Sequence, residues 1–117
     1  MKWITAIGLL LLATSPTAAE VCLASVYGTK DADQNGTTTA SGIPLRDNAL
    51  TMAHNTYKMR GFMRITNLKT GKVVVLQVTD RGPHVVGRCA DITHEAARQL
   101  GVPINSLTKV AVEGVAK

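Results

Sequence analysis

One acid and one base stand side by side at the end of an apolar run, in the motif Asp80-Arg81-Gly82-Pro83. The segment before it, 72–79, is rich in valine and leucine, which predicts a buried strand. Gly82 permits a tight bend and Pro83 cannot continue a strand ladder, so the strand is expected to stop there. A carboxyl group held at the end of a packed strand is well placed for proton transfer. The alternative is that Asp80 and Arg81 only cap the strand.

Two more residues are candidates for the same chemistry. Asp91 leads from a predicted strand, 86–91, into a helix cap, so it either serves catalysis or accepts backbone N–H groups at the helix start. His54 ends an apolar segment, and imidazole is the side chain that titrates near neutral pH. No spacing of the histidines and cysteines resembles a zinc site, and the acidic stretch 31–36 lacks the closing Glu of a calcium loop. We therefore expect no metal and no cofactor.

The elements that must position these groups are short. Apolar or alternating patterns predict strands over 21–27, 49–54, 61–67, 72–79, 86–91 and 108–112. The segment 68–71 is expected to form a hairpin turn, and Thr93 is expected to cap a helix over 94–100 that ends at Gly101. The tail from Glu113 is expected to fray. Six short strands and one helix favour a small closed β-barrel, which has no open edges.

The start of the chain predicts a signal peptide covering residues 1–19. Lys2 supplies a positive charge, Trp3–Ala13 is an apolar run, and Thr17-Ala18-Ala19 offers small residues for cleavage after Ala19. The apolar run falls short of the roughly 20 residues that cross a bilayer. We therefore expect one domain over 20–117, exported to the periplasm or secreted, with no stable membrane insertion after cleavage.

The domain contains two cysteines, Cys22 and Cys89. In an oxidising compartment an even pair most simply forms a disulfide, and closing so long a loop contributes about 4 kcal/mol. The alternative is a lipid anchor on Cys22. We disfavour the anchor because Glu20 brings a charge to a position where a lipoprotein signal has small or apolar residues.

The charge of the chain favours an anionic polymer as partner. The formal net charge is +5 at pH 7, and it falls to +4 once Lys2 leaves with the signal. A basic exported domain suits a cell wall or a membrane surface. Nucleic acid is disfavoured by the export and by the single Phe and single Trp, the Trp lying inside the signal. We expect a monomer.

Taken together, the motifs resemble the RlpA-like domain of the rare lipoprotein A family, the septal lytic transglycosylases of bacteria. The matching segments come in the family's order and spacing at 24–28, 39–42, 49–54, 64–68, 78–83 and 91–97. The resemblance covers 23–112 and implies an all-β fold, a six-stranded double-psi β-barrel with one short helix, related to barwin and expansin domains. It also implies activity or binding on the glycan strands of peptidoglycan.

The resemblance assigns roles only where this chain matches the family. The catalytic candidate of the family's Asp-Arg-Gly-Pro motif is Asp80, the family's histidine is His54, and Asp91 stands where expansins have a second functional Asp. Residues assigned to substrate binding are Tyr27, Thr39, Ser41 and Arg81. The chain departs from the family at Ile43, where an active-site Glu is usual.

The prediction is an endolytic lytic transglycosylase that leaves 1,6-anhydro ends on glycan strands. One carboxylic acid can protonate the glycosidic oxygen and then take the proton of the sugar's 6-hydroxyl, whereas a hydrolase normally uses two carboxylates. Asp80 would be this acid and base, Asp91 would stabilise positive charge, and His54 would orient the substrate. The alternative is a non-catalytic, expansin-like module that binds or loosens wall polysaccharide, which Ile43 favours. A third possibility is a barwin-like protein that acts on host polysaccharide.

Overall fold

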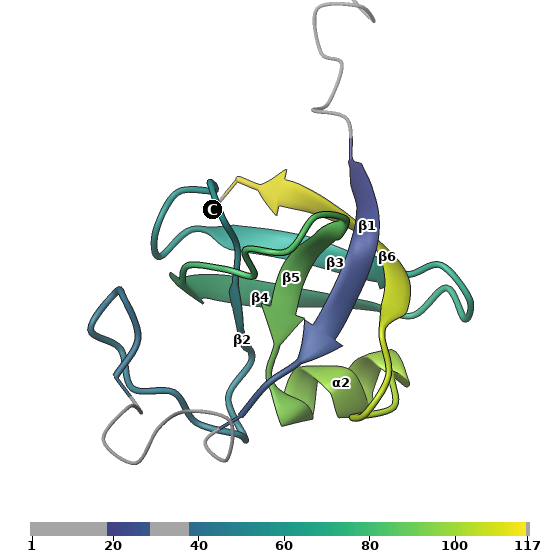
Figure 1. Cartoon of the computed structure of the whole chain (residues 1–117), viewed down its shortest axis with the longest axis horizontal. Coiled ribbons are helices and arrows are strands. Elements are labelled where there is room, and N and C mark those ends of the chain that lie inside the picture. The colour runs from purple at the N-terminus through teal and green to yellow at the C-terminus, as the bar shows by residue number, and fades with distance from the viewer. Residues whose placement is uncertain (1–18, 29–37, 117) are drawn as a thin grey trace, which may run out of the picture.

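A computed structural model describes residues 19–28 and 38–116. Within these residues the elements are β1 (Glu20–Val26), β2 (Thr51–Ala53), β3 (Phe62–Asn67), β4 (Val73–Asp80), β5 (Arg88–Ile92), α2 (His94–Leu100) and β6 (Thr108–Val115). The strands close into a barrel in the order β1-β5-β2-β4-β3-β6 (Figure 1). The predicted six-stranded barrel with one short helix is confirmed. The signal-peptide prediction, except for its last residue, and the acidic stretch 31–36 lie outside the described residues.

Two parallel strand pairs interlock in this barrel. β1 runs parallel to β5, and β2 runs parallel to β4. β2 and β5 are antiparallel neighbours, so they join the two pairs to each other. This arrangement is that of a double-psi β-barrel, and it places the C-terminal part of β1 beside β5 and the C-terminal part of β4 beside β2.

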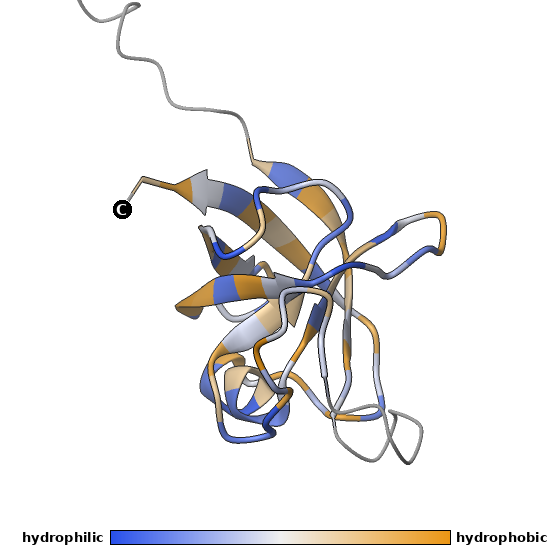
Figure 2. Cartoon of the chain, turned by 90° about the vertical axis from the view of Figure 1, so that its left-hand side faces the viewer, coloured by the Kyte–Doolittle hydropathy of each residue, from blue (hydrophilic) through white to orange (hydrophobic). Residues whose placement is uncertain are grey.

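The strands fill the barrel with alternate side chains, and hydrophobic and hydrophilic residues alternate along them (Figure 2). The largest fully buried apolar side chains are Met52, Ile65, Leu76, Ile92, Leu100, Val78, Val110 and Val112. The predicted burial of the whole apolar run 72–79 is wrong for its first half. Val73 is 51% exposed and Val75 is 38% exposed, whereas Val74 and Leu76 are buried. A barrel strand has an outer face in solvent, so successive valines point to opposite sides.

Two element bounds differ clearly from the prediction. The tail from Glu113 does not fray, because β6 continues through it, and Glu113 stands opposite Arg64 of β3 with a salt bridge of 3.0 Å. The predicted strand 86–91 begins only at Arg88, since a turn containing Gly87 at φ 88° precedes it. Cross-strand pairing, which the local sequence does not encode, extends β6, whereas the turn at Gly87 sets the start of β5.

The predicted helix is confirmed with both of its caps. The Oγ1 of Thr93 accepts a hydrogen bond from the Ala96 amide, and Gly101 ends the helix in the left-handed region at φ 72°. Ala96, Ala97 and Leu100 are fully buried, so this face of α2 completes the core at one end of the barrel (Figure 1).

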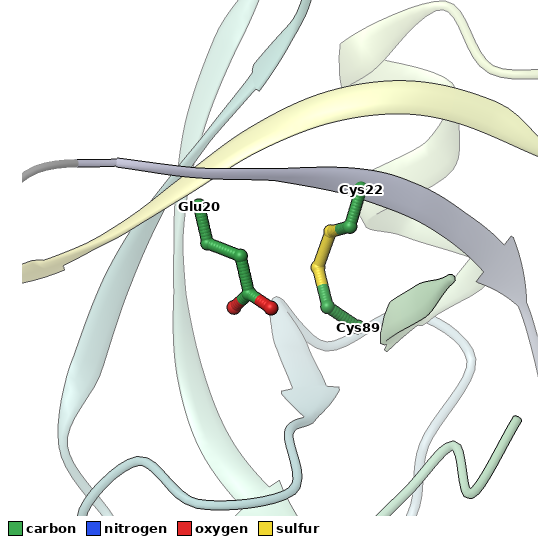
Figure 3. Close-up of side chains that lie close together, drawn as sticks. All are labelled: Glu20, Cys22 and Cys89. Carbon is green, nitrogen blue, oxygen red and sulfur yellow. A yellow bond between two sulfur atoms is a disulfide. The ribbon is translucent and has the colours of Figure 1, made fainter. Parts of the chain in front are cut away.

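The predicted disulfide joins Cys22 of β1 to Cys89 of β5. The sulfur of Cys22 is bonded to that of Cys89 and is therefore not free to carry a lipid. The carboxylate of Glu20 lies beside the bridge, with its oxygen and the two sulfurs within 4.8 Å of one another (Figure 3). Metal binding by cysteine requires thiolates, so this group is not a metal site while the bridge is intact. Among the described helices, none has the length and apolar character needed to span a membrane.

Candidate active site

Two of the predicted acids lie on either side of β2. Ala53 is aligned with Asp80 of β4 on one side and with Asp91 of β5 on the other. Neighbouring strands lie about 4.8 Å apart, so the backbones of the two acids are about 10 Å apart. β1 extends this row, with Ser25 aligned with Asp91. The barrel thus aligns residues from four strands, β1, β5, β2 and β4.

Asp80 is half-buried, and the backbone fixes one of its carboxylate oxygens. Its Oδ1 accepts hydrogen bonds from the amides of Arg81 at 2.9 Å and Ala40 at 3.0 Å. Its Oδ2 has no hydrogen-bond or ion-pair partner among the described residues. The expected corner follows, with Gly82 at φ 123° and a cis peptide to Pro83. A carboxyl group anchored by one oxygen leaves the other free to exchange a proton with a bound molecule.

The loop before β2 supplies the Ala40 amide, and hydroxyl groups hold that loop in shape. Thr39 Oγ1 lies 2.9 Å from Ser41 Oγ and donates to the carbonyl of Ile43 at 2.5 Å. Ser41 Oγ accepts from the Ile43 amide at 3.1 Å, and the Ser41 amide donates to the carbonyl of Thr79. Both hydroxyls are therefore engaged within the loop, and their assignment to substrate binding stays a prediction.

Asp91 lies in a charged cluster. Its Oδ1 accepts hydrogen bonds from the Ser25 hydroxyl and from Nη2 of Arg88 at 3.3 Å. The same Nη2 donates to Ser25 Oγ at 2.5 Å, so the three side chains form a closed network. A hollow of about 230 Å³ opens beside it, lined by Ser25, Val26, Arg88 and residues 104–107. The cluster thus holds the Asp91 carboxylate in an ion pair with Arg88, and Ser25 and Arg88 line the small cavity.

Tyr27 follows β1 and lies within electrostatic reach of both acids. Burial, and then the negative charges of Asp80 and Asp91, raise the pKa of Tyr27 far above its ordinary value. Its hydroxyl oxygen is buried and has no hydrogen-bond partner among the described residues. A phenol in this state is protonated at neutral pH, and its O–H is available as a donor.

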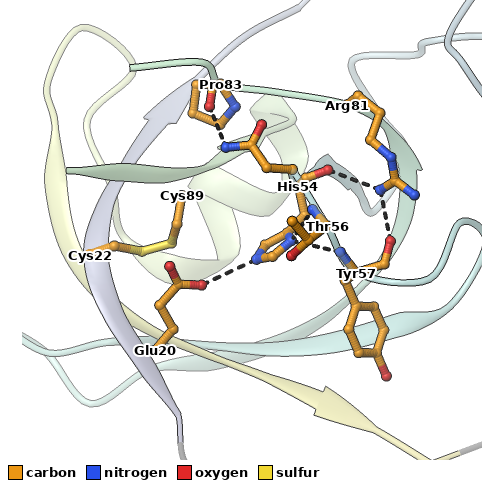
Figure 4. Close-up of polar contacts among 9 residues, drawn as sticks. Glu20, Cys22, His54, Thr56, Tyr57, Arg81, Pro83 and Cys89 are labelled. Atoms are coloured by element: carbon orange, nitrogen blue, oxygen red, sulfur yellow. Dashed lines mark hydrogen bonds and ion pairs between the residues drawn. A yellow bond between two sulfur atoms is a disulfide. The ribbon is translucent and has the colours of Figure 1, made fainter. Parts of the chain in front are cut away.

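The imidazole of His54 points toward Glu20 at the start of β1 (Figure 4). Its Nε2 lies 3.3 Å from the carboxylate of Glu20, and its Nδ1 accepts hydrogen bonds from the amides of Thr56 and Tyr57 at 3.2 and 3.1 Å. Because Nδ1 accepts two N–H bonds, the proton of the neutral ring lies on Nε2. The buried ring therefore holds the turn after β2.

Arg81 reaches the same turn from the other side. Its Nη1 donates to the carbonyls of His54 at 3.0 Å and Tyr57 at 2.7 Å (Figure 4). The side-chain amide of Asn55 donates to the carbonyl of Pro83 at 2.7 Å. These bonds connect the turn after β2 to the corner after β4. The two bonds from Arg81 also engage part of the guanidinium group, which the sequence analysis assigned to substrate binding.

The sequence-based prediction omits four residues that support the site: Glu20, Ser25, Asn55 and Arg88. Ser25 and Arg88 lie 63 residues apart and meet only because β1 pairs with β5, so no local signal marks them. Asn55 follows His54 directly, and an Asn after a predicted strand is a turn signal that would have drawn attention to it.

Solved structures share this double-psi β-barrel. An apo expansin from Clavibacter michiganensis matches with a TM-score of 0.62 at 23% identity, over 85% of this chain and 51% of that one. A papain inhibitor from Streptomyces matches with a TM-score of 0.62 at 14% identity, over 88% and 96%. A mutant of the Clavibacter expansin in complex with cellohexaose matches with a TM-score of 0.58 at 22% identity, over 83% and 51%. At these identities the likeness shows the fold alone.

The family model described as lytic transglycolase matches residues 19–116, so the chain belongs to that family. The endolytic peptidoglycan transglycosylase RlpA of Yersinia pestis is 38% identical over 98 residues, which are 84% of this chain and 26% of the relative. The protein of the same name from Pseudomonas aeruginosa strain UCBPP-PA14 is 39% identical over 92 residues, 79% of this chain and 26% of the relative. The resemblance to the RlpA-like family is confirmed. The chain spans about a quarter of the length of these relatives.

Proposed function

We propose that this domain is an endolytic lytic transglycosylase that cleaves the glycan strands of peptidoglycan and leaves 1,6-anhydro ends. Membership of the lytic transglycolase family and the names of its relatives support this function. The observation that carries the proposal is the state of Asp80, with one oxygen fixed by two amides and the other without a partner among the described residues.

In the proposed reaction the Oδ2 of Asp80 carries a proton and gives it to the glycosidic oxygen as the bond from that oxygen to C1 breaks. The carboxylate then takes the proton of the sugar's 6-hydroxyl, whose oxygen bonds to C1 and closes the anhydro ring. Asp80 ends the cycle protonated, and no water is consumed. One acid performs both steps, so Ile43 in place of an acid is compatible with the chemistry.

The neighbouring groups have distinct proposed roles. Asp91 presents a fixed negative charge to the positive charge that develops at C1. Tyr27, whose hydroxyl has no partner among the described residues, donates its hydrogen to a substrate oxygen, because a buried hydroxyl gains most when a ligand supplies its missing partner. His54 and Arg81 act as positioning residues that hold the turn after β2 against the corner beside Asp80.

Digestion of glycan strands without stem peptides, followed by mass spectrometry, tests the reaction. The wild-type protein is expected to release anhydro-ended fragments, and Asp80→Asn is expected to lower the rate by at least about 100-fold. Glu113→Gln is the matched control, because it makes the same change in an acid of β6 that pairs with Arg64 and lies outside the proposed site. An absence of anhydro ends from the wild type, or equal yields from Asp80→Asn, would contradict the proposal.

A binding module without catalysis is the second candidate, and Ile43 favours it because the usual acid of the family is missing there. The Clavibacter expansin of the same fold has been solved with cellohexaose, which makes glycan binding a reasonable alternative use of the barrel. Retention on purified sacculi without release of any fragment would support this function in place of cleavage.

We also propose that the domain works as a monomer outside the cytoplasm. The disulfide between Cys22 and Cys89 supports export, because such bridges persist in oxidising compartments. N-terminal sequencing of the exported protein is expected to give Glu20 as the first residue. Retention of the first nineteen residues would contradict cleavage after Ala19.

A further inference from the structure

A larger hollow lies at the opposite end of β4 from Asp80. It has a volume of about 700 Å³ and lies between the β3–β4 turn and the segment that joins α2 to β6. We call it the basic groove; its lining includes Asn67, Leu68, Lys69, Pro103, Leu107 and Lys109. β4 advances seven residues from Val73 to Asp80, which separates the groove from the candidate active site by about 23 Å.

Hydrogen bonds fix the walls of the basic groove. The buried side chain of Asn67 donates through Nδ2 to the carbonyl of Leu100 at 2.8 Å, and its Oδ1 accepts from the Lys69 amide at 2.9 Å. The Leu68 amide donates to the carbonyl of Lys109 at 3.2 Å. One side chain thus joins the β3–β4 turn to the end of α2, and the groove is formed before any partner arrives.

The charge around the basic groove is positive and not neutralised. Lys69 and Lys109 are exposed and form no salt bridge with a described residue. The Nζ of Lys72 lies at the end of α2, 3.5 Å from where a Cβ on Gly101 would stand, and adds a third cation. None of the described acidic residues falls in the segments that line the groove. Such a patch attracts an anionic partner.

The same groove also exposes large apolar side chains. Leu68 is 47% exposed and Leu107 is 51% exposed. Exposed apolar side chains with polar neighbours mark contact surfaces, and a volume of about 700 Å³ is within the range of ligand-binding hollows. A phosphate polymer has no apolar groups to contact Leu68 and Leu107. A flat bilayer surface cannot fill a concave hollow. A peptide with both acidic and apolar side chains matches every feature.

We propose that the basic groove binds an extended acidic segment of a partner protein. Carboxylates of the segment pair with Lys69 and Lys109, and its apolar side chains contact Leu68 and Leu107. Binding there leaves the end of β4 that carries Asp80 open, so a partner can hold the domain without covering the candidate active site. The proposal does not depend on the activity proposed above.

Fluorescence anisotropy with a labelled peptide of alternating Glu and Leu residues tests this site. The Lys69→Glu/Lys109→Glu variant is expected to weaken binding by at least about tenfold, and Leu107→Ala by about threefold. The matched controls are Arg46→Glu/Lys58→Glu, with the same change in net charge, and Val86→Ala, with a fully exposed apolar side chain. Both controls are expected to bind within about twofold of the wild type.

Three results would overturn the proposal: no binding of the peptide by the wild type, equal weakening by the Arg46→Glu/Lys58→Glu control, or binding to phosphatidylglycerol vesicles without binding to the peptide. The last result would assign the surface to a membrane. Glycan cleavage by the Lys69→Glu/Lys109→Glu variant is expected to equal that of the wild type. Failure of either proposal therefore leaves the other testable.

Discussion

Asp80 and Asp91 have equivalent positions beside Ala53 but different surroundings. Oδ1 of Asp80 is held by two backbone amides, which carry no full charge, and its other oxygen contacts no polar partner in the described parts of the chain. Oδ1 of Asp91 is shared by a hydroxyl and the guanidinium of Arg88. These surroundings suit Asp80 to proton exchange and Asp91 to a fixed negative charge. Two residues of one type thus acquire different roles from their neighbours, as in other enzymes that use paired carboxylates.

The largest expected effect is a loss of activity, and it differs between substitutions of Asp80 and of Asp91. Asp80→Asn is expected to lower kcat by about 10²–10⁴-fold, because the proton donor is lost while the amide oxygen still accepts both backbone bonds. Asp91→Asn is expected to cost about 10–100-fold, because a neutral amide stabilises a developing cation less well. Initial rates of anhydro-end formation measure both. Equal losses in the two variants would contradict the assignment of separate roles.

The second largest effect concerns the bridge that fixes β1 against β5. Cys22→Ala/Cys89→Ala removes the cross-link between residues 67 apart in sequence, and it is expected to lower the free energy of unfolding by about 4 kcal/mol. Denaturant titration measures the loss. β1 carries Ser25, so amide exchange is expected to increase more around Asp91 than around Asp80. A uniform increase in amide exchange across the barrel would show that the disulfide does not stabilise the surroundings of Asp91 more than those of Asp80.

The sequence predicts most of the strands and the helix. It does not predict which residues of different strands lie side by side in the candidate site. Thr93 and Gly101 carry local cap signals, so the helix and its ends were predicted correctly. The alignment of Ser25, Asp91 and Ala53 depends on pairing between strands that are far apart in the chain, and no periodicity encodes that pairing. The sequence pattern therefore nominated Asp80 and Asp91 one at a time, and only the strand pairing places them on either side of Ala53.

The imidazole of His54 illustrates the same limit at the level of a single side chain. The sequence places a histidine at the end of a predicted strand. It does not show that both ring nitrogens are engaged by Glu20 and by the turn amides. Side-chain direction depends on the packing around the residue, so residue type and position predicted a candidate without predicting its partners.

A smaller effect is expected on stability, when the positive charge of Arg88 beside Asp91 is removed. Arg88→Met keeps the apolar part of the side chain and removes the charge, which leaves the carboxylate partly buried without its cation. The free energy of unfolding is expected to fall by about 1–2 kcal/mol, less than for a fully buried pair because both side chains reach solvent. Arg64→Met is the matched control, since its pair with Glu113 is more exposed and is expected to contribute under about 1 kcal/mol. Equal losses would show that the Asp91 cluster is an ordinary surface pair.

The smallest effect concerns the hydroxyl of Tyr27, which the charges of both acids influence. Tyr27→Phe removes a buried hydroxyl that has no partner among residues 19–28 and 38–116, so the unfolding free energy is expected to rise by about 1 kcal/mol while glycan cleavage slows. The raised pKa of Tyr27 gives a second readout. The folded state keeps the proton and the unfolded state loses it above about pH 10, so the wild type loses stability as the pH rises through this range. Tyr27→Phe is expected to lose less stability between about pH 9 and about pH 11, and identical alkaline slopes in the two proteins would show that neither burial nor the two carboxylates raise the pKa of this phenol.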